Sequence, residues 1–188
     1  MSILRDWLAE RSLRSRASSF ARALAAEPST DDVSWLAGTA TQDDADHARW
    51  ELRYLRWAVG ILAAERDALD DRTPAAVSHA VLERMRADPN IAADRIQVAE
   101  QQFAQRLLRY REALREREGT PAAERLAGAL LAVASDDRPR APEAVTRGAE
   151  VVRTYRQTAN EELRRAFGET ALPENVVPSA LPRRGARR

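Results

Sequence analysis

The sequence predicts an all-α protein, an antiparallel bundle of about five to seven helices arranged around one long central helix. Apolar residues recur at alternating spacings of three and four, which is the period of an amphipathic helix. Residues that favour helix starts and ends separate these stretches, and no segment alternates between apolar and polar residues as a strand does. The expected helices cover residues 3–26, 31–37, 42–71, 74–87, 92–118, 121–135 and 142–167.

The chain has 188 residues, which is the usual length of one domain. We expect a helical domain over residues 1–168, in which residues 1–28 form a more peripheral N-terminal helix. Residues 169–188 are rich in proline and arginine. They are therefore expected to form an extended or flexible tail.

The expected N-terminal helix changes its apolar side part-way along its length. Two apolar groups lie roughly 140° apart at 100° per residue: Ile3, Leu4, Trp7 and Leu8 in the first, and Leu13, Ala17, Phe20 and Leu24 in the second. A helix lying on a membrane would keep one apolar face. Packing on its own bundle is the favoured interpretation. Contact with a second chain is the alternative, for which Trp7 and Leu8 are the candidate residues.

Helix starts and ends are marked by capping residues, prolines and glycines. Thr30 before two aspartates predicts one start, and Thr41 with Asp44 three residues later predicts a capping box. Prolines that follow a cap residue or open a helix predict further starts, and glycines predict ends. These marks are Thr73-Pro74, Thr120-Pro121, Pro142, Gly38 and Gly168.

The helix expected over 42–71 carries two apolar seams on nearly opposite sides. The first seam consists of Ala48, Leu52, Leu55, Val59, Leu62 and Leu69, and the second of Trp50, Tyr54, Trp57, Ile61, Ala64 and Ala68. A helix that is apolar on two sides needs neighbours on both, so this one is the central element. Trp50, Tyr54 and Trp57 are candidates for holding a ligand or cofactor, but core packing is the favoured explanation and no cofactor is predicted.

The composition excludes several kinds of chemistry. The chain contains no cysteine, and all 30 of its basic residues are arginine. Disulfides, thiol catalysis, Schiff-base lysines and the lysine of a phosphate-binding loop are therefore absent. Because no glycine-rich nucleotide loop or hydrolase motif occurs either, no catalytic residue is assigned and we lean towards a protein that is not an enzyme.

Asp44, His47 and Glu51 are the candidate metal ligands. His47 and Glu51 are four residues apart and share one face of a helix, with Asp44 three residues before His47. The other histidine, His79, would lie on the order of 27 Å from His47 along the helix, too far for a shared site. An exposed histidine–glutamate pair is the favoured interpretation.

The many arginines raise the alternative of nucleic-acid binding. The best patch is in the tail, where the candidate residues are Arg183, Arg184, Arg187 and Arg188. The net charge of only +1 argues against a dedicated nucleic-acid protein. Contacts through the tail that ignore base sequence remain an alternative.

These observations predict a non-enzymatic helical interaction or scaffold protein that acts through protein–protein contacts. A ligand- or metal-binding bundle is the alternative, and nucleic-acid contact through the tail is the second alternative. Self-association is expected because the Trp50–Tyr54 end of the central helix needs cover, either from the N-terminal helix or from a second copy. No uncharged run is long enough for a membrane span, so the cytoplasm is the expected location.

Overall fold

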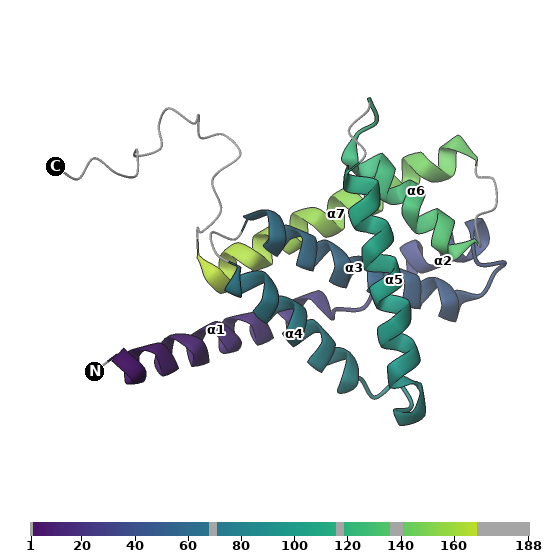
Figure 1. Ribbon diagram of the computed structural model, residues 1–188. Helices are drawn as coiled ribbons and strands as arrows, with labels where there is room; N and C mark the ends of the chain where they lie inside the picture. The colour runs from purple at the N-terminus through teal and green to yellow at the C-terminus, as the bar shows by residue number, and fades with distance from the viewer. Residues whose placement is uncertain (1, 68–70, 116–118, 136–140, 169–188) are drawn as a thin grey trace.

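The computed structural model describes residues 2–67, 71–115, 119–135 and 141–168, with side chains from Trp7 onward. In these ranges it contains helices and no strand, which confirms the all-α bundle (Figure 1). The helices are α1 (Ser2–Leu24), α2 (Thr30–Thr39), α3 (Ala45–Asp67), α4 (Arg72–Arg86), α5 (Ile96–Arg115), α6 (Ala122–Ala134) and α7 (Pro142–Phe167), with a short 3-10 helix at Ala93–Arg95. No helix in the described ranges has both the length and the apolarity to cross a membrane.

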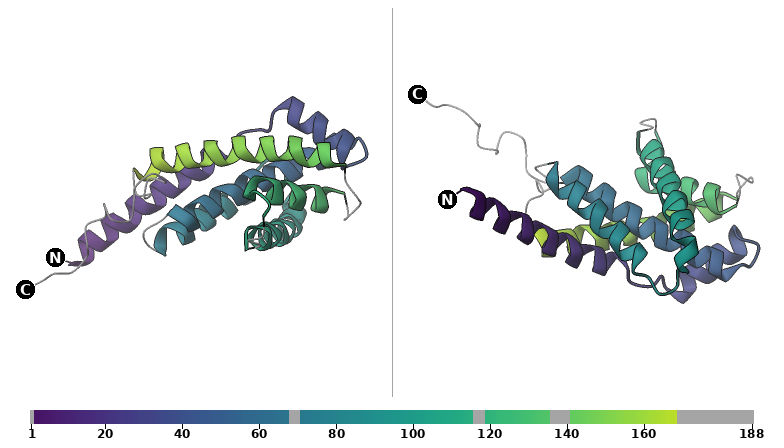
Figure 2. Two further views of the ribbon diagram at one scale, coloured as in Figure 1. Left: turned by 90° about the horizontal axis from the view of Figure 1, so that it is seen from above. Right: turned by 60° about the horizontal axis from the view of Figure 1, so that its bottom comes forward.

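Helix α3 is the central element, as its two seams predict. It contacts each of the other six helices, and its buried residues come from both seams, including Leu52 and Leu55 from the first and Trp57 and Ile61 from the second. Seen from above, α7 lies on one side of α3 and α5 on the other (Figure 2). The last residues of both seams, at 68 and 69, lie outside the described residues.

Helix α5 covers the aromatic end of α3. The ring of Phe103 lies 6.0 Å from the rings of both Tyr54 and Trp57, edge-on to the second. For Tyr54, therefore, the cover comes from α5 and not from α1 or a second copy of the chain, whereas Trp50 remains half-buried. The apolar seam of α5 supplies the cover, because Phe103 and Tyr110 are both buried.

The start of α3 differs from the expected capping box. Gln42 and Asp43 have positive φ angles of 56° and 65°, so the chain turns here and the helix begins at Ala45. The carboxylate of Asp44 accepts a hydrogen bond of 2.9 Å from the His47 backbone N–H, which makes Asp44 the cap. The Thr41 hydroxyl instead donates to the Asp44 carbonyl oxygen at 2.6 Å.

The predicted boundaries of α7 agree with the structure, whereas those of α2 differ from it. Pro142 opens α7 and Gly168, with a φ of 78°, follows its last residue, as predicted. Ser29 rather than Thr30 caps α2, since its side chain accepts from the Asp32 N–H at 3.1 Å. Helix α2 also continues through Gly38, because a glycine lowers helix stability without forcing an end.

The second half of α1 anchors this helix to the bundle. Its first buried side chain among those described is Ala17, and Phe20 packs edge-on against Phe167 of α7 with ring centroids 6.4 Å apart. A Cβ on Gly60 of α3 would lie only 2.2 Å from the Leu24 side chain, so the glycine permits this close approach. The N-terminal end of α1 extends beyond the other helices (Figures 1 and 2).

We predict that Leu55→Ala lowers the free energy of unfolding by about 2–5 kcal/mol, because it removes buried methyl groups from a packed core. Leu55 has no exposed surface. The matched control is Leu108→Ala on α5, where the side chain is 53% exposed and a change within about 0.5 kcal/mol is expected. Urea unfolding of both variants measures the difference. Equal effects would show that the first seam does not form the core.

Candidate functional site

The predicted metal ligands are not assembled into a metal site. Asp44 caps α3. The carboxylate of Glu51 accepts hydrogen bonds from Arg106 of α5: Nη2 donates to Oε1 at 2.7 Å, and Nε lies 3.2 Å from both carboxylate oxygens. His47 Nε2 lies 3.5 Å from the same carboxylate. Within the described ranges, no group of three or more His, Cys, Asp or Glu residues could hold a metal ion.

Glu51 differs from the sequence expectation in its burial. The expected pair was exposed, but Glu51 is only 1% exposed, while the His47 side chain is 39% exposed. A buried carboxylate needs a partner that compensates its charge. Arg106 supplies it with a two-point contact of the kind that favours arginine over lysine.

All three tyrosines of the chain have raised pKa values. Burial, and then the negative charge of Glu51, raises the pKa of Tyr54 to about 12 and that of Tyr110 well above its usual value. Burial, followed by the charge of Asp32, raises the pKa of Tyr155. These side chains therefore keep their protons at neutral pH.

A second buried ion pair joins α3 to the segment between α4 and α5. Arg53 pairs with Asp88, and each of these side chains is only 7% exposed. The Arg53 guanidinium carbon also lies 4.5 Å from the ring centroid of Trp50 and 5.5 Å from that of Trp57. The charge thus lies close to two indole rings and two carboxylates, since Glu27 Oε1 is also 3.7 Å from Arg53 Nη2. Cation–π attraction is stronger in such a site because water is excluded.

The three aromatic candidates on α3 occupy different environments. Trp57 is 1% exposed and belongs to the core. Trp50 is half-buried and lines two surface hollows. The hollow of about 320 Å³ is also lined by Tyr54, Ile91, Ala92, Asn90, Arg95, Val98, Ala99 and Gln102, and the hollow of about 540 Å³ by Glu27, Asp46, Arg49, Arg53 and Asn90. Of the three candidates, Trp50 is therefore the one with surface that a ligand could touch, because Tyr54 borders the first hollow but is only 3% exposed.

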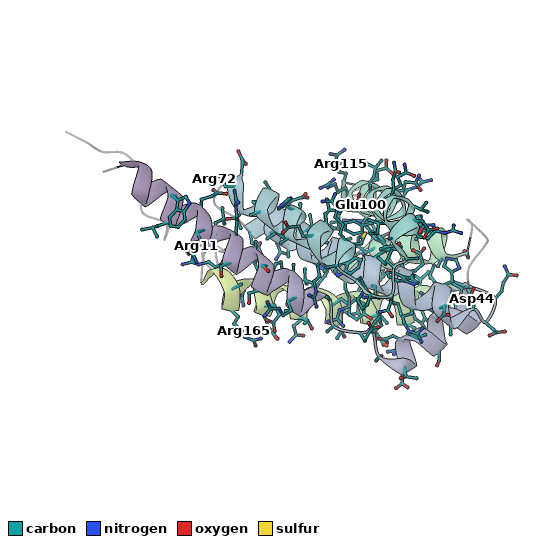
Figure 3. All side chains as sticks on the ribbon, turned by 90° about the horizontal axis from the view of Figure 1, so that it is seen from below. Arg11, Asp44, Arg72, Glu100, Arg115 and Arg165 are labelled. Atoms are coloured by element: carbon teal, nitrogen blue, oxygen red, sulfur yellow. The ribbon has the colours of Figure 1, made fainter. Side chains whose placement is uncertain are left out.

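The first half of α1 places apolar side chains in water. Trp7 is 54% exposed and Leu8 is 52% exposed. The guanidinium carbon of Arg11 lies 5.5 Å from the centroid of the Trp7 ring. This part of the chain, from Trp7 to Glu10, is called the α1 arm below. The labelled side chains place the arm and the α3 cap at opposite ends of the molecule, with Arg11 near one end and Asp44 at the other (Figure 3).

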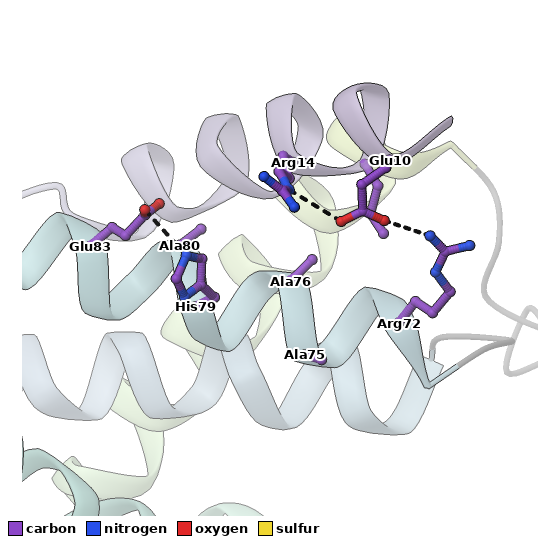
Figure 4. A pocket seen from close by; sticks show the side chains of 9 residues that line it. Glu10, Arg14, Arg72, Ala75, Ala76, His79, Ala80 and Glu83 are labelled. Atoms are coloured by element: carbon purple, nitrogen blue, oxygen red, sulfur yellow. Dashed lines mark hydrogen bonds and ion pairs between the residues drawn. The ribbon is translucent and has the colours of Figure 1, made fainter. Parts of the chain in front are cut away.

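A groove of about 410 Å³ lies between α1 and α4, directly beside the arm (Figure 4). Its lining residues are Glu10, Leu13, Arg14, Arg72, Ala75, Ala76, His79, Ala80 and Glu83. At one end the Glu10 carboxylate accepts hydrogen bonds from Arg72 and Arg14, and these bonds lower its pKa. At the other end His79 Nε2 lies 3.2 Å from Glu83 Oε1.

The exposed indole and the groove lie on the same side of α1. Trp7 stands one helical turn before Glu10 and two turns before Arg14, and both of these residues line the groove. Sequence reasoning missed the groove, although a signal was present. Ala75, Ala76 and Ala80 occur at helical spacing, and their small side chains leave the space open.

The tail candidates Arg183, Arg184, Arg187 and Arg188 lie outside the described residues. Comparisons of the chain with models of known protein families, with curated proteins and with solved structures give no match. A function for this chain must therefore be inferred from the chemistry of the surfaces described above.

We predict that Arg106→Gln lowers the free energy of unfolding by about 3–5 kcal/mol, because it leaves the buried Glu51 carboxylate without its compensating charge. The matched control is Arg109→Gln on the same helix, whose side chain is 63% exposed and whose loss is expected to cost no more than about 0.5 kcal/mol. Urea unfolding measures both. Similar losses in the two variants would contradict a compensating role for Arg106.

We also predict that the protein loses stability as the pH rises from about 10 towards about 12. The tyrosines of the unfolded chain have a pKa of about 10, whereas burial raises the pKa of Tyr54 in the folded chain to about 12. The unfolded state then binds fewer protons, so stability is complete below pH about 10 and falls above it. Tyrosinate absorbance and chemical unfolding measured across this range test it. Tyrosine ionisation with a midpoint near pH about 10 in the folded chain would contradict it.

Proposed function

We propose that this chain is a cytoplasmic, non-enzymatic helical interaction or scaffold protein, and that the α1 arm makes its protein–protein contacts. The observation that carries the proposal is the exposure of Trp7 and Leu8 on a part of α1 that extends beyond the bundle. Exposed aromatic residues are the side chains most enriched at interfaces.

The surroundings of Trp7 support this role. The Arg11 guanidinium lies over the indole, and the adjoining groove gives a partner both apolar and charged groups to contact. The few residues that supply most of an interface's binding energy are typically aromatic side chains and arginines that become buried when the partner binds. Within the described residues, the other two large exposed apolar side chains are Val98 and Leu108, both on α5.

Site-specific photo-crosslinking of the full chain in its native cells tests the proposal. A benzophenone amino acid replaces Trp7 in one variant and Leu108 in the matched control, since Leu108 is 53% exposed and lies on a different helix. We expect a discrete adduct from position 7 that the control does not give. An adduct of twice 21.0 kDa indicates self-association, and any other mass indicates another protein.

Arg11 provides a second crosslinking position that keeps Trp7 in place. We expect Trp7→Gln to reduce the adduct yield from a benzophenone at position 11 at least tenfold, the effect of losing an aromatic anchor. Two results would contradict the proposal: no adduct from position 7, or the same set of adducts from positions 7 and 108.

A further inference from the structure

The exposed indole of Trp7 belongs to a stripe of side chains along one face of α1. Trp7, Glu10, Arg11 and Arg14 line a single surface hollow of about 310 Å³. At 100° per residue these four positions lie within roughly 100° of the helix circumference. They span two helical turns, about 10 Å along the axis. This set is called the Trp7 stripe below.

The Trp7 stripe is continuous with the α1–α4 groove. Glu10 and Arg14 line both the groove and the hollow beside Trp7. Across the groove, α4 contributes the small side chains of Ala76 and Ala80 (Figure 4). A side chain from another molecule that lies over Arg14 would therefore also reach the groove, where the alanines leave space for it.

The order of residues makes the Trp7 stripe complementary to a reversed copy of itself. In an antiparallel pair with Glu10 opposite Arg11, Trp7 comes opposite Arg14. A guanidinium attracts both an aromatic ring and a carboxylate. One copy already contains both kinds of contact, because Arg11 lies over Trp7 and Arg14 donates to the Glu10 carboxylate at 3.1 Å.

The existing partners of Glu10 do not conflict with such a pair. Its two carboxylate oxygens accept one hydrogen bond each, from Arg14 and from Arg72. A carboxylate has about four lone-pair sites for hydrogen bonds. A guanidinium from a second copy can therefore join these arginines at Glu10 without displacing either of them.

A parallel pair of α1 helices lacks this complementarity. It would place Glu10 beside Glu10 and Arg11 beside Arg11, and like charges across an interface oppose association. It would also bring both bundles to the same end of the paired helices. Antiparallel helices separate the bundles, because the N-terminal end of each α1 extends beyond its own bundle (Figures 1 and 2).

We propose that the partner of the α1 arm is a second copy of this chain, and that the two α1 helices pair antiparallel about a twofold axis between Glu10 and Arg11. Each Trp7 then lies over Arg14 of the other copy, at the edge of its α1–α4 groove. This is an isologous contact, in which both copies use the same surface. The inference rests on the proposed function, since it identifies the partner of the α1 arm.

Sedimentation equilibrium of the full chain tests whether a dimer of the 21.0 kDa chain forms as the concentration rises. We expect Trp7→Gln to weaken dimerisation at least tenfold, because the indole is the aromatic anchor of the contact. The matched control is Leu108→Gln, which changes an equally exposed apolar residue on α5 and should dimerise like the native chain.

Charge reversal at the proposed axis tests the direction of pairing. Glu10→Arg places arginine opposite Arg11, and Arg11→Glu places glutamate opposite Glu10, so each variant alone should dimerise about tenfold more weakly. An equimolar mixture of the two variants restores both opposite-charge pairs and should form a heterodimer close to native affinity. Arg16→Glu, an exposed position on the opposite face of α1, is the matched control and should leave dimerisation unchanged. Circular dichroism confirms that each variant remains helical.

Three results would overturn the inference: a native chain that is monomeric at high micromolar concentration, native dimerisation in Trp7→Gln, or a mixture of the charge variants that associates no more tightly than either alone. A monomeric chain that still gives a discrete adduct with another protein from position 7 overturns this inference and leaves the proposed function standing. A monomeric chain that gives no adduct from position 7 overturns both.

Discussion

The burial of α3 on both of its apolar sides is the constraint on which the rest of the structure depends. A helix with two opposite apolar seams is stable in water only when neighbours cover both, and α3 accordingly contacts all six other helices. Because neighbouring helices pack on both seams, they also bury polar residues of α3 that lie between the two seams. Glu51 and Arg53 are buried for this reason, and each requires a partner of opposite charge from another segment.

The two buried ion pairs fix how α5 and the segment before it sit on α3. Arg106 must face Glu51, and Asp88 must face Arg53. Burying such pairs contributes little net stability compared with apolar packing, but any other alignment would leave an uncompensated charge inside the protein. The apolar contacts of Phe103 with Tyr54 and Trp57 supply attraction along the same boundary. The ion pairs thus select among alignments that the apolar contacts alone would tolerate.

The sequence predicted which faces of α3 are buried, because spacing along one helix determines direction around its axis. It also predicted the ends of α7, where Pro142 and Gly168 act locally. Contacts between residues that are far apart in the sequence were not predictable from this spacing. Glu51 and Arg106 are separated by 55 residues, and the pattern around His47 suggested an exposed pair because periodicity shows the direction of a residue but not its depth. The α1–α4 groove depends on small side chains such as Ala76, whose effect appears only once the helices are packed.

The two halves of α1 differ in how they are held to the bundle. Two side chains hold the second half: Phe20 packs against Phe167, and Leu24 packs against the backbone of Gly60. The first half receives no comparable packing from the described residues, and a short helix in water is marginally stable by itself. Its continuation as a helix is supported instead by its covalent link to the anchored half and by the Glu10–Arg72 and Glu10–Arg14 pairs at the groove. Trp7 keeps 54% of its surface exposed at this position, so most of the apolar burial that an indole can gain is not used by the fold.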